Sequence, residues 1–324
     1  MPFSSRIIES FKLPKARISI AVESQAENVV KQIMRAEQKN GTVTVVEVYP
    51  GYGLLTKALL KSTNPSIRKV YAFEPEKKCE SELTELSKEF NGRLDFSIEN
   101  VSREKALQKI GEKLDNEGVV PTYPWEESQI PLPTKSDNYV LSLLLRALTS
   151  RLSFFAFGRV EMNLLLPDPL LRRVYTDEVD TSRRVLDLCI QAFAETKVLM
   201  VVPQEDVAPK SKKSTEKKNQ LSLVRITPLA TPKIESSMYN TYKYILSNLF
   251  HVPTQPLKQR IRSIACGAEN LLPKLSFNTK IAAGRMTVDQ VCELTRVFEE
   301  WPFRPKLEEL IHVYDEEFEK KRRR

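Results

Sequence analysis

The sequence is poor in the residues from which most metal sites and catalytic triads are built. Its 324 residues include only two histidines, His251 and His312, which argues against histidine-based metal or triad chemistry. The four cysteines are widely separated and match neither a zinc site nor a disulfide framework. They are Cys79, Cys189, Cys266 and Cys292. The chain also has no Walker A lysine motif and no G-x-S-x-G elbow, so it predicts neither P-loop nucleotide hydrolysis nor serine hydrolase chemistry.

A long uncharged hydrophobic run is missing as well. The longest apolar-rich stretch, residues 139–157, contains Arg146 and Arg151 together with several serines and threonines. This pattern predicts a buried amphipathic helix and not a membrane span. We therefore expect no membrane partner.

Positive charge is abundant. The net charge is +8 and the pI is about 9.1, which favours a polyanion such as nucleic acid as partner. The alternative is a basic but otherwise ordinary soluble protein. Residues 1–17 carry four cations against one acid and several serines. This arm resembles a mitochondrial import sequence, and the alternative is a basic arm that lies on the domain surface.

The order of apolar patterns predicts two domains. Strand-like and helix-like segments alternate between residues 18 and 230, which predicts an α/β doubly wound parallel sheet. We expect helices at 18–36, 54–61 and 75–90, strands at 42–49, 69–73 and 93–98, and a long proline-rich loop at 116–136. A lysine-rich insertion is expected at 203–220, followed by a helical domain at 231–324 that ends in a cationic tail.

One turn stands out within the first domain. An apolar run ends at Pro50-Gly51-Tyr52-Gly53, and a helical pattern begins at Leu54. A strand, a glycine turn and a helix start together let backbone N–H groups approach a nucleotide-like ligand. The first glycine of such a turn is replaced by Tyr49, whose side chain we expect to crowd the ligand.

Three carboxylates follow the ends of successive predicted strands. Glu47 precedes the glycine turn, Glu74 ends the second strand, and Glu99 ends the third. The carboxyl ends of adjacent parallel strands face one crevice, where an acid can bind a ribose diol. Together they describe the S-adenosylmethionine pocket of a class I methyltransferase. The alternative for each acid alone is a solvated strand end.

At these residues the chain resembles the rRNA adenine N6-dimethyltransferase family, and within it the mitochondrial transcription factor B branch of fungal type. The similar segments are VEVYPGYGLLTKALL, FGRVEMNLLLP, LVRITP, the basic KQRIRS at 258–263 and EEWPFRPK, in the family's order. The resemblance implies a class I methyltransferase (Rossmann-like) doubly wound sheet with a small C-terminal helical domain.

The chain departs from the family at the catalytic loop. The family carries N-[LI]-P-[YF] after its fourth strand, where an Asn accepts hydrogen bonds from the adenine amine and a ring stacks on the base. The best match is Pro131-Leu132-Pro133-Thr134, which has neither group. This predicts that methyl transfer is lost, that no cofactor is required, and that S-adenosylmethionine binding is doubtful. The vestigial pocket would comprise Glu47, Tyr49, Gly51, Gly53, Glu74 and Glu99.

The resemblance implies a non-enzymatic role in the mitochondrial matrix. The protein would be a monomeric initiation factor that helps the single-subunit mitochondrial RNA polymerase melt promoter DNA and select the start site. It would hold the non-template single strand and could also bind RNA. The candidate nucleic-acid contacts are Tyr123, Trp125, Lys258, Arg260, Arg262, Lys320, Lys321, Arg322, Arg323 and Arg324. Each has a plainer alternative, which is loop packing for the aromatics, a solvated helix face for 258–262, and a frayed end for the tail.

Two other functions stay open from the sequence. One is an active rRNA adenine dimethyltransferase that uses S-adenosylmethionine. The other is a non-catalytic RNA-binding factor for assembly of the mitochondrial ribosome.

Overall fold

The computed structural model describes residues 19–34, 43–62, 67–99, 104–116, 130–135, 138–175, 184–208 and 220–306. The chain divides into two compact units, Met1–Tyr175 with Ala194–Ala230, and Thr176–Phe193 with Thr231–Arg324. The second range differs from the expected boundary, because residues 176–193 group with the helical unit and not with the sheet. The predicted arm 1–17, the aromatics Tyr123 and Trp125, and the tail 320–324 lie outside the described residues.

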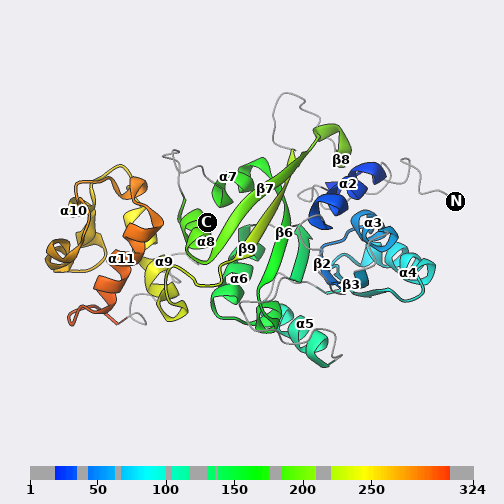
Figure 1. Ribbon diagram of the computed structural model, residues 1–324, viewed down its shortest axis with the longest axis horizontal. Coiled ribbons are helices and arrows are strands. Elements are labelled where there is room, and N and C mark those ends of the chain that lie inside the picture. The colour runs from blue at the N-terminus through cyan, green and yellow to red at the C-terminus, as the bar shows by residue number, and fades with distance from the viewer. Residues whose placement is uncertain are drawn as a thin grey trace. The chain divides into compact units, whose positions relative to one another are not determined.

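The first unit is built on a sheet whose strands follow the order β4-β3-β2-β5-β6-β9-β7 (Figure 1). Their bounds are β2 Val43–Val48, β3 Ile67–Phe73, β4 Leu94–Ser97, β5 Ile130–Lys135, β6 Val160–Pro167, β7 Ala194–Val202 and β9 Leu221–Pro228. The pairings among β2 to β6 are parallel, whereas β9 runs antiparallel to both β6 and β7. The strand order proceeds outward from β2 in both directions, so the carboxyl end of β2 is a topological switch point, where such sheets bind ligands.

The helices of this unit are α2 Glu23–Met34, α3 Leu54–Lys61, α4 Glu80–Glu89, α5 Glu104–Asn116, α6 Asn138–Thr149 and α7 Asp168–Val174. Helix α3 shows why they form here, since Leu55, Ala58 and Leu59 recur at helical spacing and are buried while Lys61 is exposed. These side chains join one core with the inner faces of α2, β2 and β3. Helices α2 and α3 lie side by side against the sheet (Figure 1).

Two very short strands add a second pairing. Strands β1 Ser19–Ile20 and β8 Val207–Ala208 pair antiparallel, so the segment expected to be one helix from residue 18 begins with a strand. The expected insertion at 203–220 likewise starts with a 3₁₀ turn, Gln204–Asp206, and then β8. This pairing anchors the beginning of the described chain to residues 207–208.

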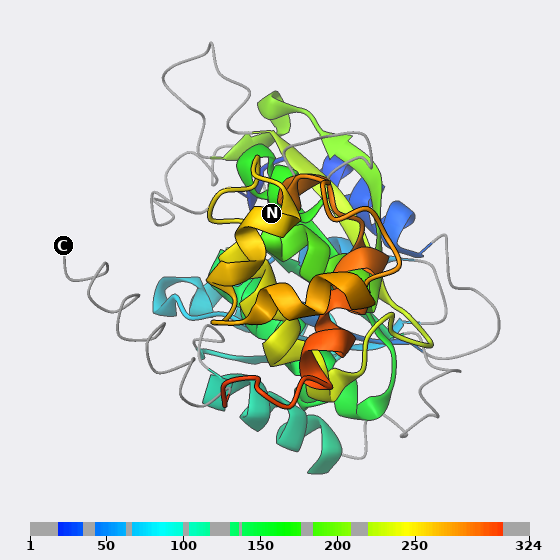
Figure 2. The ribbon, with the colours of Figure 1, turned by 90° about the vertical axis from the view of Figure 1, so that its left-hand side faces the viewer.

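The second unit is helical. It contains α8 Val185–Phe193, α9 Tyr239–Leu249, α10 Leu257–Arg260 and α11 Val288–Glu299, joined by 3₁₀ turns (Figure 2). Helix α8 belongs here because its buried face packs on α9 and α11. The Tyr242 hydroxyl donates a hydrogen bond of 3.0 Å to the Leu188 carbonyl, and the Phe193 and Tyr239 rings meet edge to face.

The proline-rich segment contains a strand that the sequence pattern conceals. Strand β5 carries Pro131 and Pro133, and it pairs with β6 along its length but with β2 only between Val48 and Thr134. Alternate prolines remove the N–H groups from one side of a strand, which a sheet tolerates where that side is largely unpaired. The expectation of a continuous loop over 116–136 was therefore wrong for residues 130–135.

A further difference concerns the direction of one strand in the sheet. The expectation of an all-parallel sheet was wrong for β9, which forms two antiparallel pairings. Across the described parts of the chain, no helix is long and apolar enough to cross a membrane.

Candidate cofactor site and nucleic-acid contacts

The glycine turn after β2 keeps a glycine-like backbone at all three positions. Tyr49, Gly51 and Gly53 have φ of 63°, 64° and 77°. The Tyr49 N–H donates to the Phe73 carbonyl at 2.9 Å, which holds this left-handed residue against β3. A left-handed conformation costs a non-glycine residue about 1 kcal/mol. The tyrosine therefore changes the side chain at this position but not the path of the backbone.

The two glycines differ in what surrounds them. A Cβ atom on Gly51 would meet no atom within 4 Å, so open space lies beside it. A Cβ atom on Gly53 would lie 2.4 Å from Leu86 Cδ1 of α4. Gly53 is thus required for helix packing, whereas Gly51 leaves room for a ligand to approach the backbone.

Glu74 is fixed directly against this turn. Its side chain is fully buried, and its Oε2 accepts a hydrogen bond of 2.8 Å from the Gly51 N–H. Its Oε1 accepts a second bond of 2.9 Å from the Glu76 N–H. These two backbone hydrogen bonds keep the carboxylate in one orientation.

Glu47 joins the strand before the turn to the helix after it. It is 2% exposed, and its Oε2 accepts a hydrogen bond of 2.7 Å from the Thr56 hydroxyl in the first turn of α3. Glu99 differs from the other two acids because it lies beyond the end of β4 and is exposed. The structure therefore brings Glu47, Glu74 and the glycine turn together, and leaves Glu99 at the surface.

Tyr52, within the turn, is held as a neutral phenol. Burial raises the pKa of its hydroxyl to about 12, and the neighbouring Cys79 and Glu82 add to that rise. In the sequence, only its position between Gly51 and Gly53 indicated that Tyr52 belongs to the site. Within the described residues, no group of His, Cys, Asp or Glu side chains could hold a metal ion.

The structure changes the interpretation of Pro131-Leu132-Pro133-Thr134. These residues lie inside β5, in register with Glu161 to Leu164 of β6, and not in the loop that follows the strand. That loop comprises residues 136–137, outside the described part, and is followed by Asn138 at the start of α6. The missing groups at Pro131 and Thr134 therefore give no reason to infer a lost catalytic loop.

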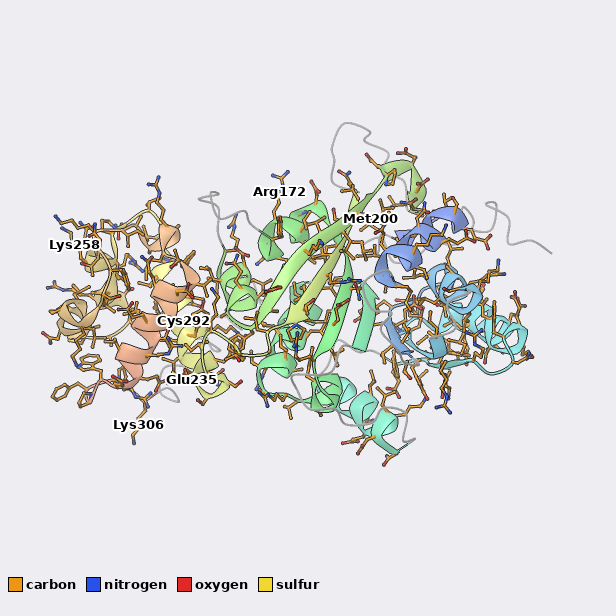
Figure 3. All side chains as sticks on the ribbon, viewed as in Figure 1. Arg172, Met200, Glu235, Lys258, Cys292 and Lys306 are labelled. Carbon is orange, nitrogen blue, oxygen red and sulfur yellow. The ribbon has the colours of Figure 1, made fainter. Side chains whose placement is uncertain are left out.

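The basic candidates in the second unit have different roles. Lys258 is exposed and points away from the unit (Figure 3), and Arg262 is exposed with its Nε 3.4 Å from Glu269 Oε1. Arg260 instead donates from Nη2 to the Asn248 carbonyl at 2.6 Å and is half-buried, so it holds α9 and α10 together. Its expected phosphate contact is not favoured by this position.

Sequence reasoning missed several exposed groups of the same unit. The cations Lys274, Lys280 and Arg285 are exposed and accompany Lys258 and Arg262 between residues 251 and 286, where Glu269 is the only acid. Their wide spacing along the chain gave no local charge run. Phe303 is 80% exposed, and its ring lies 6.3 Å from that of buried Trp301.

Comparison with known proteins finds one family match and several relatives. Residues 141–300 match the family described as Ribosomal RNA adenine dimethylase. The chain is 27% identical to Dimethyladenosine transferase 2, mitochondrial, of Rattus norvegicus, over 76% of this chain and 68% of that protein. It is 24% identical to Ribosomal RNA small subunit methyltransferase A of Nitrosospira multiformis, over 86% and 92%.

Solved structures agree on the fold. A dimethyladenosine transferase from Plasmodium falciparum superposes with a TM-score of 0.57 at 14% identity, covering 84% of this chain and 96% of that one. The 23S rRNA methyltransferase ErmE superposes with a TM-score of 0.53 at 13% identity, covering 87% and 99%. These likenesses confirm the class I methyltransferase (Rossmann-like) fold.

The prediction that the protein is not an enzyme is contradicted by these relatives. They are named as methyltransferases or dimethyladenosine transferases, and the residues taken as a degenerate catalytic loop lie within a strand. The match is to the rRNA adenine dimethyltransferase family that the sequence motifs resemble, and it does not show the transcription factor B branch within it. Residues 141–300 thus resemble the ribosomal RNA adenine dimethylase family, and mitochondrial dimethyladenosine transferases are among the relatives that the chain is similar to.

Proposed function

We propose that the protein is an S-adenosylmethionine-dependent methyltransferase that acts on adenine in RNA. The observation that carries this proposal is the buried Glu74 carboxylate, bonded at 2.8 Å to the N–H of Gly51 in the turn that opens α3. A glycine turn and an acid at the end of the next strand are the elements that hold the sugar of a nucleotide-like cofactor in such sheets.

The residues present fit this cofactor. Open space beside Gly51 allows close approach to the backbone, and two backbone hydrogen bonds hold the Glu74 carboxylate against the turn. Glu47 and Thr56 keep the strand and helix on either side of the turn in place. When bound, S-adenosylmethionine would supply an activated methyl group.

The segment after β5 is the best place for groups that meet the substrate. Val48 pairs with Thr134, so the chain leaves β5 beside the glycine turn, at the switch point of the sheet. Adenine N6 needs hydrogen-bond acceptors close to the incoming methyl group. Helix α6 begins at Asn138, directly after this segment, so an acceptor at this edge of the sheet would lie beside the glycine turn.

RNA as the substrate is supported by charge. The net charge is +8, and the exposed cations between residues 251 and 286 outnumber the single acid of that segment. Relatives carry names that specify ribosomal RNA and mitochondria. We extend both to this chain as part of the proposal, with the mitochondrial matrix as its location.

The decisive experiment measures cofactor binding and methyl transfer together. Calorimetry with S-adenosylhomocysteine should detect binding to the wild type, and Glu74→Gln should weaken it at least about tenfold. The control is Glu80→Gln, an exposed acid of α4 that should leave binding unchanged. Radiolabelled methyl transfer to small-subunit rRNA should follow the same order. A wild type that binds no cofactor would refute the proposal.

A second candidate is assistance to a mitochondrial RNA polymerase at promoter opening. The observation that favours it is the exposed ring of Phe303, followed by Arg304 and Lys306, which suits an unpaired base and its phosphates. It does not exclude methyl transfer. Run-off transcription on duplex and pre-melted promoters tests it, since a melting factor stimulates only the duplex. Equal effects on both templates would leave RNA as the partner, either as methylation substrate or in ribosome assembly.

A further inference from the structure

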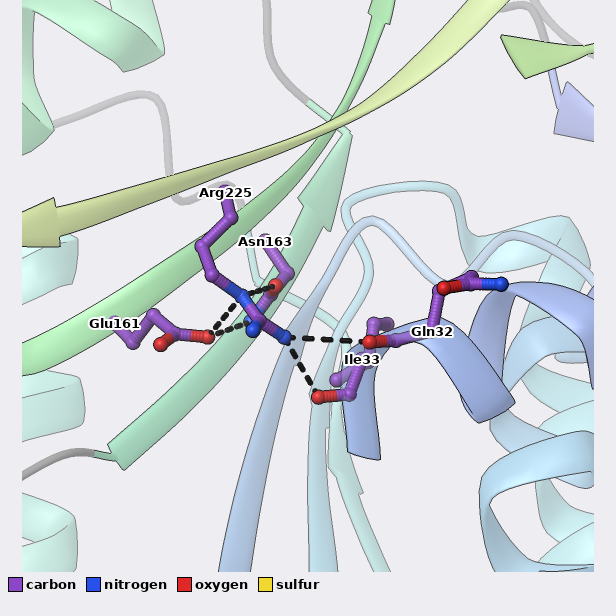
Figure 4. Close-up of polar contacts among 5 residues, drawn as sticks. All are labelled: Gln32, Ile33, Glu161, Asn163 and Arg225. Carbon is purple, nitrogen blue, oxygen red and sulfur yellow. Dashed lines mark hydrogen bonds and ion pairs between the residues drawn. The ribbon is translucent and has the colours of Figure 1, made fainter. Parts of the chain in front are cut away.

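The sheet of the first unit contains a buried charged cluster outside the candidate cofactor site. Arg225 of β9 is 8% exposed, and its Nε lies 2.6 Å from Glu161 Oε1 and donates to Asn163 Oδ1 at 3.1 Å. The Asn163 amide donates to the same Glu161 oxygen at 3.1 Å. Figure 4 shows these three side chains together with the end of α2.

The guanidinium also reaches the last turn of α2. Its Nη2 donates to the Ile33 carbonyl at 2.7 Å and, over 3.4 Å, to the Gln32 carbonyl (Figure 4). The last carbonyls of a helix have no partner within the helix, and the helix dipole places partial negative charge there. Arg225 supplies both the donors and the compensating charge, while Glu161 and Asn163 hold the guanidinium in place.

The cluster lies level with the candidate site. Val48 pairs with Thr134, Pro133 with Asn163, and Asn163 with Arg225. Glu47, one residue before Val48, is therefore in the same row of the sheet as Asn163 and Arg225. Side chains of one row point to one face, and Glu47 faces α3 because it bonds to Thr56.

Helix α2 connects this cluster to the glycine turn. Lys61 at the end of α3 bonds to Glu23 at the start of α2 at 2.6 Å, so the two helices run in opposite directions. The last turn of α2 is thus directed toward the start of α3, where the glycine turn enters the helix. Because α3 packs against α2 and begins at the glycine turn, fixing that end of α2 restricts the motion of α3.

We infer that Arg225 is a positioning residue, which anchors the end of α2 to the sheet and thereby holds α3 and the glycine turn in their binding geometry. The effect on the cofactor rests on the proposed function, whereas the effect on the helices does not. A buried ion pair that served stability alone could be replaced by apolar side chains without loss. The anchoring role predicts a defect that such a replacement does not repair.

The test uses two variants of the full chain and a matched control. Arg225→Met removes the donor, and the triple variant Arg225→Met, Glu161→Met, Asn163→Leu also removes the groups it would leave unpaired. The control is Arg93→Met, because Arg93 also donates to two main-chain carbonyls, Leu60 and Ile67, but at the far end of α3. Thermal unfolding selects the variants that fold, and the triple variant should recover stability that the single variant loses.

Hydrogen exchange then measures how firmly the end of α2 is held, without any cofactor. Amides at the end of α2 and in residues 49–56 should exchange about tenfold faster in the triple variant than in the wild type. Their exchange rates should be unchanged in Arg93→Met. S-adenosylhomocysteine should bind the triple variant about tenfold more weakly than the wild type. Unchanged exchange in a folded triple variant would overturn the inference. Faster exchange with unaltered affinity would overturn the claim that anchoring α2 holds the glycine turn in its binding geometry. A wild type that fails to bind S-adenosylhomocysteine would refute only the proposed function, because exchange at residues 49–56 still tests the anchoring role of Arg225.

Discussion

At the scale of single residues, backbone conformation explains the candidate site better than motif matching does. Tyr49 occupies a position where a glycine was expected, and it adopts the same left-handed φ that a glycine would take. Its N–H bond to Phe73 and the bond from Gly51 to Glu74 hold the turn. A motif comparison registers the changed side chain, whereas the ligand-facing backbone is unchanged.

Replacing Tyr49 separates the effect of its side chain from the effect of its backbone conformation. Tyr49→Gly and Tyr49→Ala both remove the ring, but only glycine tolerates a φ of 63° without strain. We expect Tyr49→Gly to be more stable than Tyr49→Ala by about 1 kcal/mol in urea unfolding. Equal stabilities would show that residue 49 is not left-handed in solution.

The two glycines of the turn should respond differently to alanine. Both have positive φ, so each substitution costs about 1 kcal/mol. Gly53→Ala also places a Cβ atom 2.4 Å from Leu86 Cδ1, and such overpacking costs roughly 1–3 kcal/mol more. Chemical denaturation of the pair measures the difference, and a smaller loss at residue 53 than at residue 51 would contradict the packing described.

At the scale of elements, the pair α2 and α3 carries the site and is held at both ends. Arg225 binds the end of α2, while Lys61 of α3 binds its beginning at an exposed position. The two contacts differ in strength because one is buried and the other is screened by solvent.

The Lys61 contact holds the pKa of Glu23 below its ordinary value and the pKa of Lys61 above its own. Since the Glu23 pKa is lowered on folding, its contribution is present above about pH 4.3 and is lost as acid protonates the folded carboxylate. Both side chains are about 40% exposed, so the contribution is at most about 1 kcal/mol.

Lys61→Met should remove this pH dependence. Unfolding free energies of wild type and variant measured between pH 3 and 6 should converge at the acidic end. A constant difference across that range would show that Lys61 acts through packing alone.

At the scale of the whole molecule, charge is the property on which the proposed RNA binding depends. The first unit holds the candidate cofactor site, and the second carries exposed cations with little acid among residues 251–286. RNA binding that depends on phosphate contacts is salt-dependent, because each contact releases counterions.

A triple substitution tests which cations bind RNA. Lys258→Ala, Lys280→Ala and Arg285→Ala together should weaken binding of single-stranded RNA and lower the slope of log affinity against log salt by about 2. The matched control removes three exposed cations of the first unit, Arg68, Lys77 and Lys88, and should leave the slope nearly unchanged. An equal fall in both variants would mean that binding follows net charge and has no specific surface.

The sequence by itself determined the class of fold, the glycine turn, helix 54–61 and the resemblance to the dimethylase family, because apolar periodicity and short motifs are local properties. Only the tertiary structure decided that residues 130–135 form a strand, since pairing with β6 overrides their prolines. It likewise decided that Arg260 binds Asn248, and that Arg225, Glu161 and the end of α2 meet. These contacts join residues far apart in the chain, and their partners leave no periodic signal in the sequence.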